Sequence, residues 1–234
     1  METTLHISDT PQQVAADFAS FISKIAENRA INIALSGGST PEIVFDSLAS
    51  DYKDQINWRT IHFYWGDERC VPPDNEESNY KMTNDHLFNL INIPKENIHR
   101  IKGESDPKIE VQRYAQEIAK NVRSENGFPV FDLVILGLGD DGHTASIFPD
   151  QLNLIDSTEI TEIAIHPVTG QKRITLTGTV INNAKLITFL VTGANKKAKF
   201  TEILRKSGDW ESYPATYISP TNGELHWFTD IEIN

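Results

Sequence analysis

The chain has 234 residues and a formal net charge of −12, which argues against a nucleic acid partner, since that would require a basic patch. No stretch approaches the roughly 18 apolar residues that span a bilayer, and residues 1–13 lack the basic and apolar regions of a secretory signal. Cys70 is the only cysteine, so an intrachain disulfide is excluded and a reducing, cytoplasmic location is expected.

Helical and strand patterns alternate along the chain. The first helix is expected over residues 11–28, where apolar residues recur at helical spacing, with Asp9 or Thr10 as the N-cap and Pro11 in the first turn. Short apolar runs predict strands at residues 31–35, 61–65, 131–139, 185–193 and 224–230. Helical patterns fall between these runs at residues 41–50, 78–90, 106–122 and 195–207.

This alternation determines the expected fold class. Strands separated by helices are typical of βαβ units and of a parallel sheet covered on both faces. No internal repeat, low-complexity tract or long linker divides the chain. We therefore predict an α/β protein, a three-layer α/β/α single domain over residues 1–234 with a mostly parallel, Rossmann-like sheet.

Four polar or glycine-rich stretches directly follow predicted strands. They are SGGSTP (36–41), GDER (66–69), GLGDDGHTAS (137–146) and TGANK (192–196). In open α/β sheets, ligands bind in the crevice outside the carboxyl ends of the strands. The four stretches are therefore expected to form one site at that edge of the sheet.

The first stretch has the features of an anion-binding turn. Gly37 and Gly38 permit a tight turn and close approach of a ligand, while Ser39 and Thr40 supply hydroxyl groups. The N–H groups and the dipole at a helix start favour an anion. The loop has neither the Walker A lysine nor the GxGxxG spacing, and a plain strand-to-helix turn with a Ser/Thr cap is the alternative.

Two cations follow other strands. Arg69 could clamp a phosphate or carboxylate through two parallel hydrogen bonds, or it could form an internal pair with Glu68 or Asp67. Lys196 begins a helix, where a positive charge opposes the helix dipole. That lysine is expected either to turn to solvent or to compensate for a bound anion.

His143 is the most chemically useful side chain in the sequence. Histidine titrates near neutral pH, so it can take a proton from water and return it to a leaving oxygen. Asp141, two residues earlier, could orient the imidazole or contact a substrate, and a structural hydrogen bond is the alternative for the histidine. Because the chain has no GxSxG elbow and no HExxH or similar histidine pair, the residues predict a site without metal or cofactor.

Together these motifs resemble the 6-phosphogluconolactonase family. The matching segments lie between about residues 31 and 230: SGGSTP, WGDERCVPPDNEESNY, DLVILGLGDDGHTASIFP, RITLT, FLVTGANK and YPATYISPTNGELHWFTD. The resemblance implies a hydrolase that converts 6-phospho-D-glucono-1,5-lactone to 6-phosphogluconate in the oxidative pentose phosphate pathway. It also implies a small-molecule sugar-phosphate lactone as the binding partner. The charge and hydropathy argue against a nucleic acid or membrane partner, and no obligate protein partner is evident from the sequence.

The same resemblance assigns roles to residues. It makes His143 the base that activates water, supported by Asp141, and it makes Arg69 and Lys196 the groups that hold the phosphate. Lys197 is a possible substitute for Lys196, because this chain has two lysines before the alanine. The remaining residues that it places in the substrate pocket are Gly37, Gly38, Ser39, Thr40, Asp67 and Arg173. The oxyanion donor stays open, with backbone N–H groups around residues 137–142 as candidates.

Two other functions remain as alternatives. A glucosamine-6-phosphate deaminase/isomerase has a similar DGH segment, but it carries a glutamate shortly after the histidine, and the run DGHTASIFPDQ has none. A catalytically inactive sugar-phosphate sensor would usually add a basic DNA-binding domain, for which this acidic chain has no spare segment. Turnover of the lactone would separate an enzyme from a sensor.

Overall fold

Six parallel strands form the central sheet of the protein in a computed structural model that describes residues 3–27 and 29–233. Their spatial order is β1–β11–β10–β7–β2–β3, and all five neighbouring pairs are parallel. In chain order they are β1 (Thr3–Ile7), β2 (Ile31–Leu35), β3 (Ile61–Trp65), β7 (Leu133–Gly137), β10 (Leu186–Val191) and β11 (Glu224–Thr229). The predicted parallel sheet is thus confirmed.

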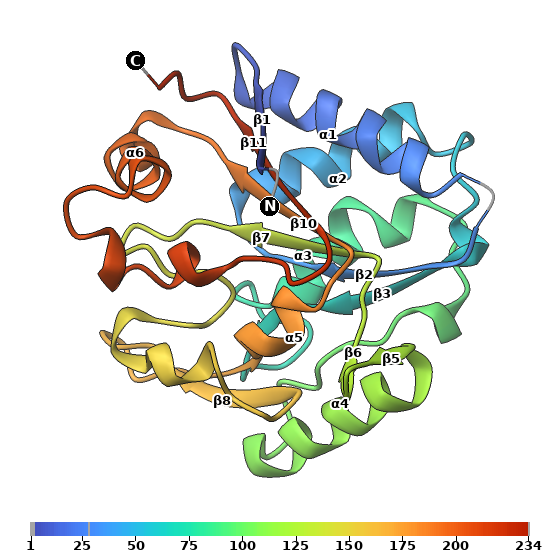
Figure 1. Cartoon of the computed structure of the whole chain (residues 1–234). Coiled ribbons are helices and arrows are strands. Elements are labelled where there is room, and N and C mark those ends of the chain that lie inside the picture. The colour runs from blue at the N-terminus through green and yellow to red at the C-terminus, as the bar shows by residue number, and fades with distance from the viewer. Residues whose placement is uncertain (1–2, 28, 234) are drawn as a thin grey trace.

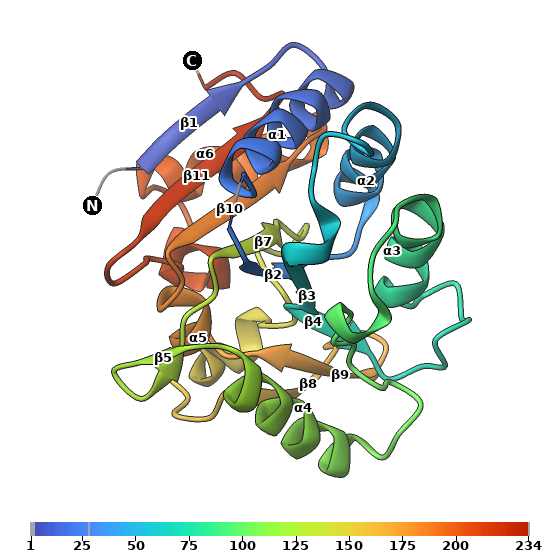
Figure 2. The same ribbon diagram turned by 90° about the vertical axis from the view of Figure 1, so that its right-hand side faces the viewer.

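Helices cover both faces of this sheet (Figures 1 and 2). Figure 2 shows α1, α2 and α3 on one side, with α4, α5 and a smaller sheet on the other. The helices are α1 (Pro11–Ile25), α2 (Ser39–Asp51), α3 (Asn79–His86), α4 (Pro107–Asn121), α5 (Gly178–Asn182) and α6 (Lys197–Arg205). The three-layer α/β/α expectation is confirmed.

The ends of α1 show how well local signals predict helix limits. Thr10, rather than Asp9, is the N-cap, and its hydroxyl accepts a hydrogen bond from the backbone N–H of Gln13 at 3.2 Å. The helix ends at Ile25, three residues before the predicted limit, and residue 28 lies outside the described residues. Val14, Phe18 and Ile22 recur at helical spacing and are buried.

Strand β1 belongs to the central sheet, but the apolar pattern does not predict it. It lies at the edge of the sheet, and none of its five residues is fully buried. All six residues of β10, by contrast, are buried because this strand lies inside the sheet with both faces covered. Apart from Val130, the buried apolar side chains of the described residues form one cluster, from which we infer that the chain folds as one domain.

A second, antiparallel sheet supplies part of the site. It contains β4 (Asp67–Arg69), β8 (Thr161–Ile165) and β9 (Lys172–Leu176), with β9 in the middle. The sequence predicts GDER only as a loop, because a three-residue polar strand carries no readable alternation. A short hairpin, β5 (Ser124–Glu125) and β6 (Phe128–Pro129), completes the described strands. Among the described residues, no helix is long and apolar enough to cross a membrane.

Candidate active site

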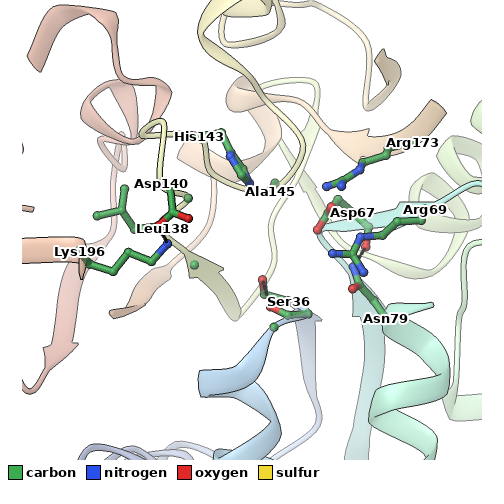
Figure 3. A pocket seen from close by; sticks show the side chains of 14 residues that line it. Ser36, Asp67, Arg69, Asn79, Leu138, Asp140, His143, Ala145, Arg173 and Lys196 are labelled. Carbon is green, nitrogen blue, oxygen red and sulfur yellow. Dashed lines mark hydrogen bonds and ion pairs between the residues drawn. The ribbon is translucent and has the colours of Figure 1, made fainter. Parts of the chain in front are cut away.

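A cavity of about 260 Å³ opens at the carboxyl ends of the central strands (Figure 3). All four stretches that the sequence singles out contribute to its lining, so the predicted convergence at one sheet edge is borne out geometrically. Seven predicted residues line it: Gly37, Gly38, Asp67, Arg69, His143, Arg173 and Lys196. Ser39 and Thr40 line an adjoining cavity of about 160 Å³, which shares Gly37, Gly38 and Lys196 with the first.

His143 reaches this cavity from the loop that follows β7. Its Nδ1 lies 2.5 Å from Oδ1 of Asp141, and the same oxygen accepts the backbone N–H of His143 at 3.1 Å. A Cβ on Gly139 would lie 2.1 Å from Nδ1 of His143, so only glycine leaves room for the ring. With Nδ1–H donated to the carboxylate, Nε2 is the nitrogen available as a proton acceptor.

Asp141 is held in its ionised form. Partial burial alone would raise the pKa of this carboxyl group, but hydrogen bonds and positive charge from His143 outweigh burial and lower the pKa to about 2. An ionised Asp141 fixes the tautomer and orientation of His143 and would stabilise an imidazolium.

This pair has a consequence for stability in acid. A carboxyl group with a depressed folded-state pKa stabilises the fold above its unfolded pKa, and the contribution is lost as the pH falls through the folded pKa. Since the pKa of Asp141 falls from 3.8 to about 2, we expect the wild type to lose stability relative to Asp141→Asn between those values. Urea unfolding of both proteins from about pH 5 to pH 2 measures this difference. A pH-independent difference would contradict the expectation.

The turn between β2 and α2 has the predicted strand–turn–helix form. Gly38, with φ of 110°, is the N-cap of α2, and no side chain caps this helix end. The alternative of a Ser/Thr-capped turn is therefore wrong, and the first backbone N–H groups of α2 lack intrahelical partners. The Thr40 hydroxyl lies 2.7 Å from that of Thr192, which follows β10. Whether this helix end binds an anion stays a prediction.

Arg69 and Arg173 face each other across the second sheet. They are directly paired in the antiparallel β4–β9 register, where like charges repel. Neither guanidinium forms an ion pair within the described residues, so the alternative Arg69 pair with Glu68 or Asp67 is absent. Both Nε atoms are buried without a partner. This end of the cavity thus holds two guanidinium groups without an ion pair, and Nη1 of Arg69 donates to the backbone oxygen of Glu77.

Asp67 lies buried beside this arginine pair. Its Oδ2 accepts a hydrogen bond from the Ser146 hydroxyl at 2.6 Å, and Nη1 of Arg173 lies 3.5 Å from the same hydroxyl. Burial lowers the pKa of Arg173, while the nearby Asp67 carboxylate opposes that shift. Asp67 therefore offsets part of the arginine charge and connects β4, through Ser146, to the loop that carries His143.

Sequence reasoning missed Asn79, which also lines the cavity. Its Nδ2 donates to the backbone oxygen of Asp67 at 2.9 Å, and its Oδ1 would lie 1.8 Å from a Cβ on Gly37. Glu68 holds Asn79 in position, because its buried carboxylate accepts hydrogen bonds from the backbone N–H groups of Asn79 and Tyr80 at the start of α3. The only sequence signal was the helix start SNY after a polar loop.

Lys196 lies on the opposite side of the cavity from the two arginines (Figure 3). Its Nζ is 2.5 Å from Oδ1 of Asp140, and its side chain is mostly buried. Lys197 is exposed and does not line the described cavities. Of the two lysines, Lys196 is therefore the one placed to contact a ligand.

The fold and site define a class of α/β protein with a His–Asp pair and three cationic side chains, Arg69, Arg173 and Lys196, around one cavity at the carboxyl edge of a parallel sheet. The chain belongs to the glucosamine-6-phosphate isomerase/6-phosphogluconolactonase family, whose profile matches residues 7–227. This confirms the resemblance seen in the motifs.

Named relatives agree with this family. A 6-phosphogluconolactonase from Haemophilus influenzae is 48% identical over 204 residues, 87% of this chain and 86% of that protein. One from Treponema pallidum is 40% identical over 193 residues, 82% of this chain and 80% of its own length.

Solved structures show the same fold. The crystal structure of the devB protein, 42% identical, has a TM-score of 0.93 and covers 97% of this chain and 96% of its own. The 6-phosphogluconolactonase from Trypanosoma brucei is 28% identical with a TM-score of 0.86, at the same coverage of each chain. A monomeric glucosamine-6-phosphate deaminase, 18% identical with a TM-score of 0.80, shares the fold alone.

Proposed function

We propose that this protein is an enzyme that hydrolyses 6-phospho-D-glucono-1,5-lactone to 6-phosphogluconate, a step of the oxidative pentose phosphate pathway. The observation that carries the proposal is the His143–Asp141 pair beside a cavity with positive charge on two sides. Relatives that are 40–48% identical bear the name 6-phosphogluconolactonase, and this chain covers most of their length.

In the proposed mechanism, His143 acts as a general base without a covalent intermediate. Nε2 takes a proton from water while the water oxygen bonds to the lactone carbonyl carbon, whose oxygen becomes negatively charged. The bond between that carbon and the ring oxygen then breaks, and the imidazolium returns the proton to the ring oxygen. Asp141 stabilises the imidazolium between these two steps. All atoms of water end in the product acid, and no metal or cofactor is needed.

The two cationic sides of the cavity suggest how the substrate lies. The product has two anionic ends, a phosphate and a new carboxylate. We propose that Lys196 and the start of α2, including Gly37–Thr40, hold the phosphate, because N–H groups and a lysine converge there. Arg69 and Arg173 then face the lactone end, where they stabilise the carbonyl oxygen as it gains charge. This divides the joint phosphate role that sequence reasoning gives to Arg69 and Lys196.

The experiment is a direct assay with the lactone generated freshly from glucose 6-phosphate. Product formation is followed through 6-phosphogluconate dehydrogenase, and spontaneous opening is subtracted with an enzyme-free control. We expect a rate far above background, with no ammonia released from glucosamine 6-phosphate. A rate equal to background with retained binding of 6-phosphogluconate would support the sensor, and ammonia release would support the deaminase.

We further propose that the enzyme acts in the cytoplasm on this small molecule without an obligate protein partner. Cys70, the only cysteine, is half-buried, and burial raises the pKa of its thiol to about 11. A thiol with a raised pKa holds little thiolate at neutral pH, and a chain with a single cysteine suits a reducing compartment.

A further inference from the structure

We propose that Phe148 is a positioning residue, one that sets the relative placement of the base His143 and Arg173; the proposal rests on the function above. Its side chain is completely buried. The ring of His143 lies 4.9 Å from that of Phe148, centroid to centroid, and Cζ of Arg173 lies 5.5 Å from the Phe148 centroid. The Phe148 ring thus contacts both the proposed base, His143, and the guanidinium of Arg173 on β9.

The contacts have a physical basis in the charge distribution of the ring. The face of an aromatic ring is electronegative, so it attracts a guanidinium that is within about 6 Å of the centroid. Arg173 has no ion pair in the described part of the chain, its Nε is buried without a hydrogen bond, and its Nη1 lies 3.5 Å from the Ser146 hydroxyl. The contact with Phe148 is therefore one of the few that hold the Arg173 side chain in place before a ligand binds.

Backbone and side-chain hydrogen bonds hold the segment just before Phe148, residues 144–146, between β7 and the second sheet. Just before it, the Thr144 hydroxyl donates to the backbone oxygen of Gly137 at 2.9 Å. The backbone N–H of Ser146 donates to the hydroxyl of Thr175 on β9 at 3.2 Å. Since the segment before Phe148 is tied to both β7 and β9, the ring relates the position of His143 to that of Arg173.

His166 is a third residue that contacts the Phe148 ring. Its ring makes an edge-on contact with Phe148 at 5.2 Å, and its Nδ1 accepts the backbone N–H groups of Val168 and Thr169, each at 3.2 Å. These bonds fix the imidazole on the turn between β8 and β9. Phe148 therefore cannot swing away from His143 and Arg173 without displacing a hydrogen-bonded neighbour.

The test replaces the ring with an aliphatic side chain in double-mutant cycles. We expect Phe148→Leu to lower kcat/KM about 10-fold in the wild-type background and by a smaller factor, about 3-fold, when Arg173→Ala is already present, because only the contact of the ring with His143 is then left to lose. In the Lys196→Ala background, on the other side of the cavity, the full loss of about 10-fold should persist. Equal losses in all three backgrounds would overturn the proposal.

Phe131→Leu is the matched control. This ring is also fully buried, but it packs edge-on against Tyr64 and, unlike Phe148, has no ring contact with His143 or Arg173 among the described residues. We expect Phe131→Leu to lower the unfolding temperature as Phe148→Leu does while leaving kcat and KM unchanged. If both leucine variants impair turnover to the same extent, Phe148 has a structural role only.

A readout that does not depend on turnover separates this proposal from the proposed function. The imidazole ¹⁵N signals of His143, assigned by their loss in His143→Ala, report the placement of the ring whatever the reaction is. We expect Phe148→Leu to shift these signals by more than the loss of the Phe148 ring current alone accounts for, and Phe131→Leu to leave them in place. Shifted signals in a protein that fails to hydrolyse the lactone would uphold the positioning role and reject the function, whereas unshifted signals would reject the positioning role.

Discussion

Replacing His143 with alanine is expected to lower kcat for lactone hydrolysis by at least about 100-fold, because positioned general bases contribute factors of 10² to 10⁴. Nε2 is the available nitrogen of the ring, since Nδ1 is bonded to Asp141. Binding of 6-phosphogluconate should survive, because the groups proposed to hold its two anionic ends, Arg69 and Lys196, are unchanged. Initial rates with fresh lactone, corrected for spontaneous opening, give kcat, and calorimetry gives the affinity for the product.

A second histidine variant provides the control. His86 lies at the end of α3 beside Asp46, outside the cavity, so His86→Ala should keep the wild-type rate. An unchanged rate in His143→Ala would remove this residue from the mechanism. A loss of both turnover and product binding would instead indicate that the ring organises the pocket, which circular dichroism and the unfolding temperature would reveal.

The strands and helices of the central fold were predictable because their signals are local. Buried parallel strands appear as continuous apolar runs, as in β10, and helices such as α1 show apolar residues at helical spacing. The strand β1 escaped because an edge strand with exposed and half-buried residues leaves no such run. Strand β4 escaped because it is three polar residues long, and its pairing with β9 is not local.

In the candidate site too, residues within short motifs could be predicted, whereas contacts between segments far apart in the chain could not. The motif residues His143, Asp141 and Gly38 were identifiable because the residues that form each motif are only a few positions apart in the sequence. The placement of Arg69 opposite Arg173 depends on the pairing of strands far apart in the chain, so sequence spacing could not show it. Asn79 and Phe148 escaped for a further reason: an amide at a helix start and a buried ring have no functional signature until their neighbours are known.

Because Arg69 and Lys196 lie on opposite sides of the cavity, substitutions at the two positions should have different effects on lactones with and without a phosphate group. Lys196→Ala should raise KM for the phosphorylated lactone by about 10-fold or more, since charge-assisted hydrogen bonds contribute roughly 1.5–3 kcal/mol. It should leave hydrolysis of phosphate-free glucono-1,5-lactone unchanged. Lys197→Ala, which alters an exposed neighbour outside the cavity, is the matched control and should behave as wild type with both substrates.

Arg69→Ala should lower kcat/KM for both lactones by a similar factor, because the proposed contact is with the carbonyl oxygen that both substrates share. Its guanidinium forms no ion pair among the described residues, its Nε has no hydrogen-bond partner, and it lies opposite Arg173, so it is available for that role. Steady-state kinetics of the variants with each lactone measure the effect directly. If Arg69→Ala impaired only the phosphorylated substrate, the phosphate would lie at the arginine side of the cavity, and the substrate orientation proposed here would have to be reversed.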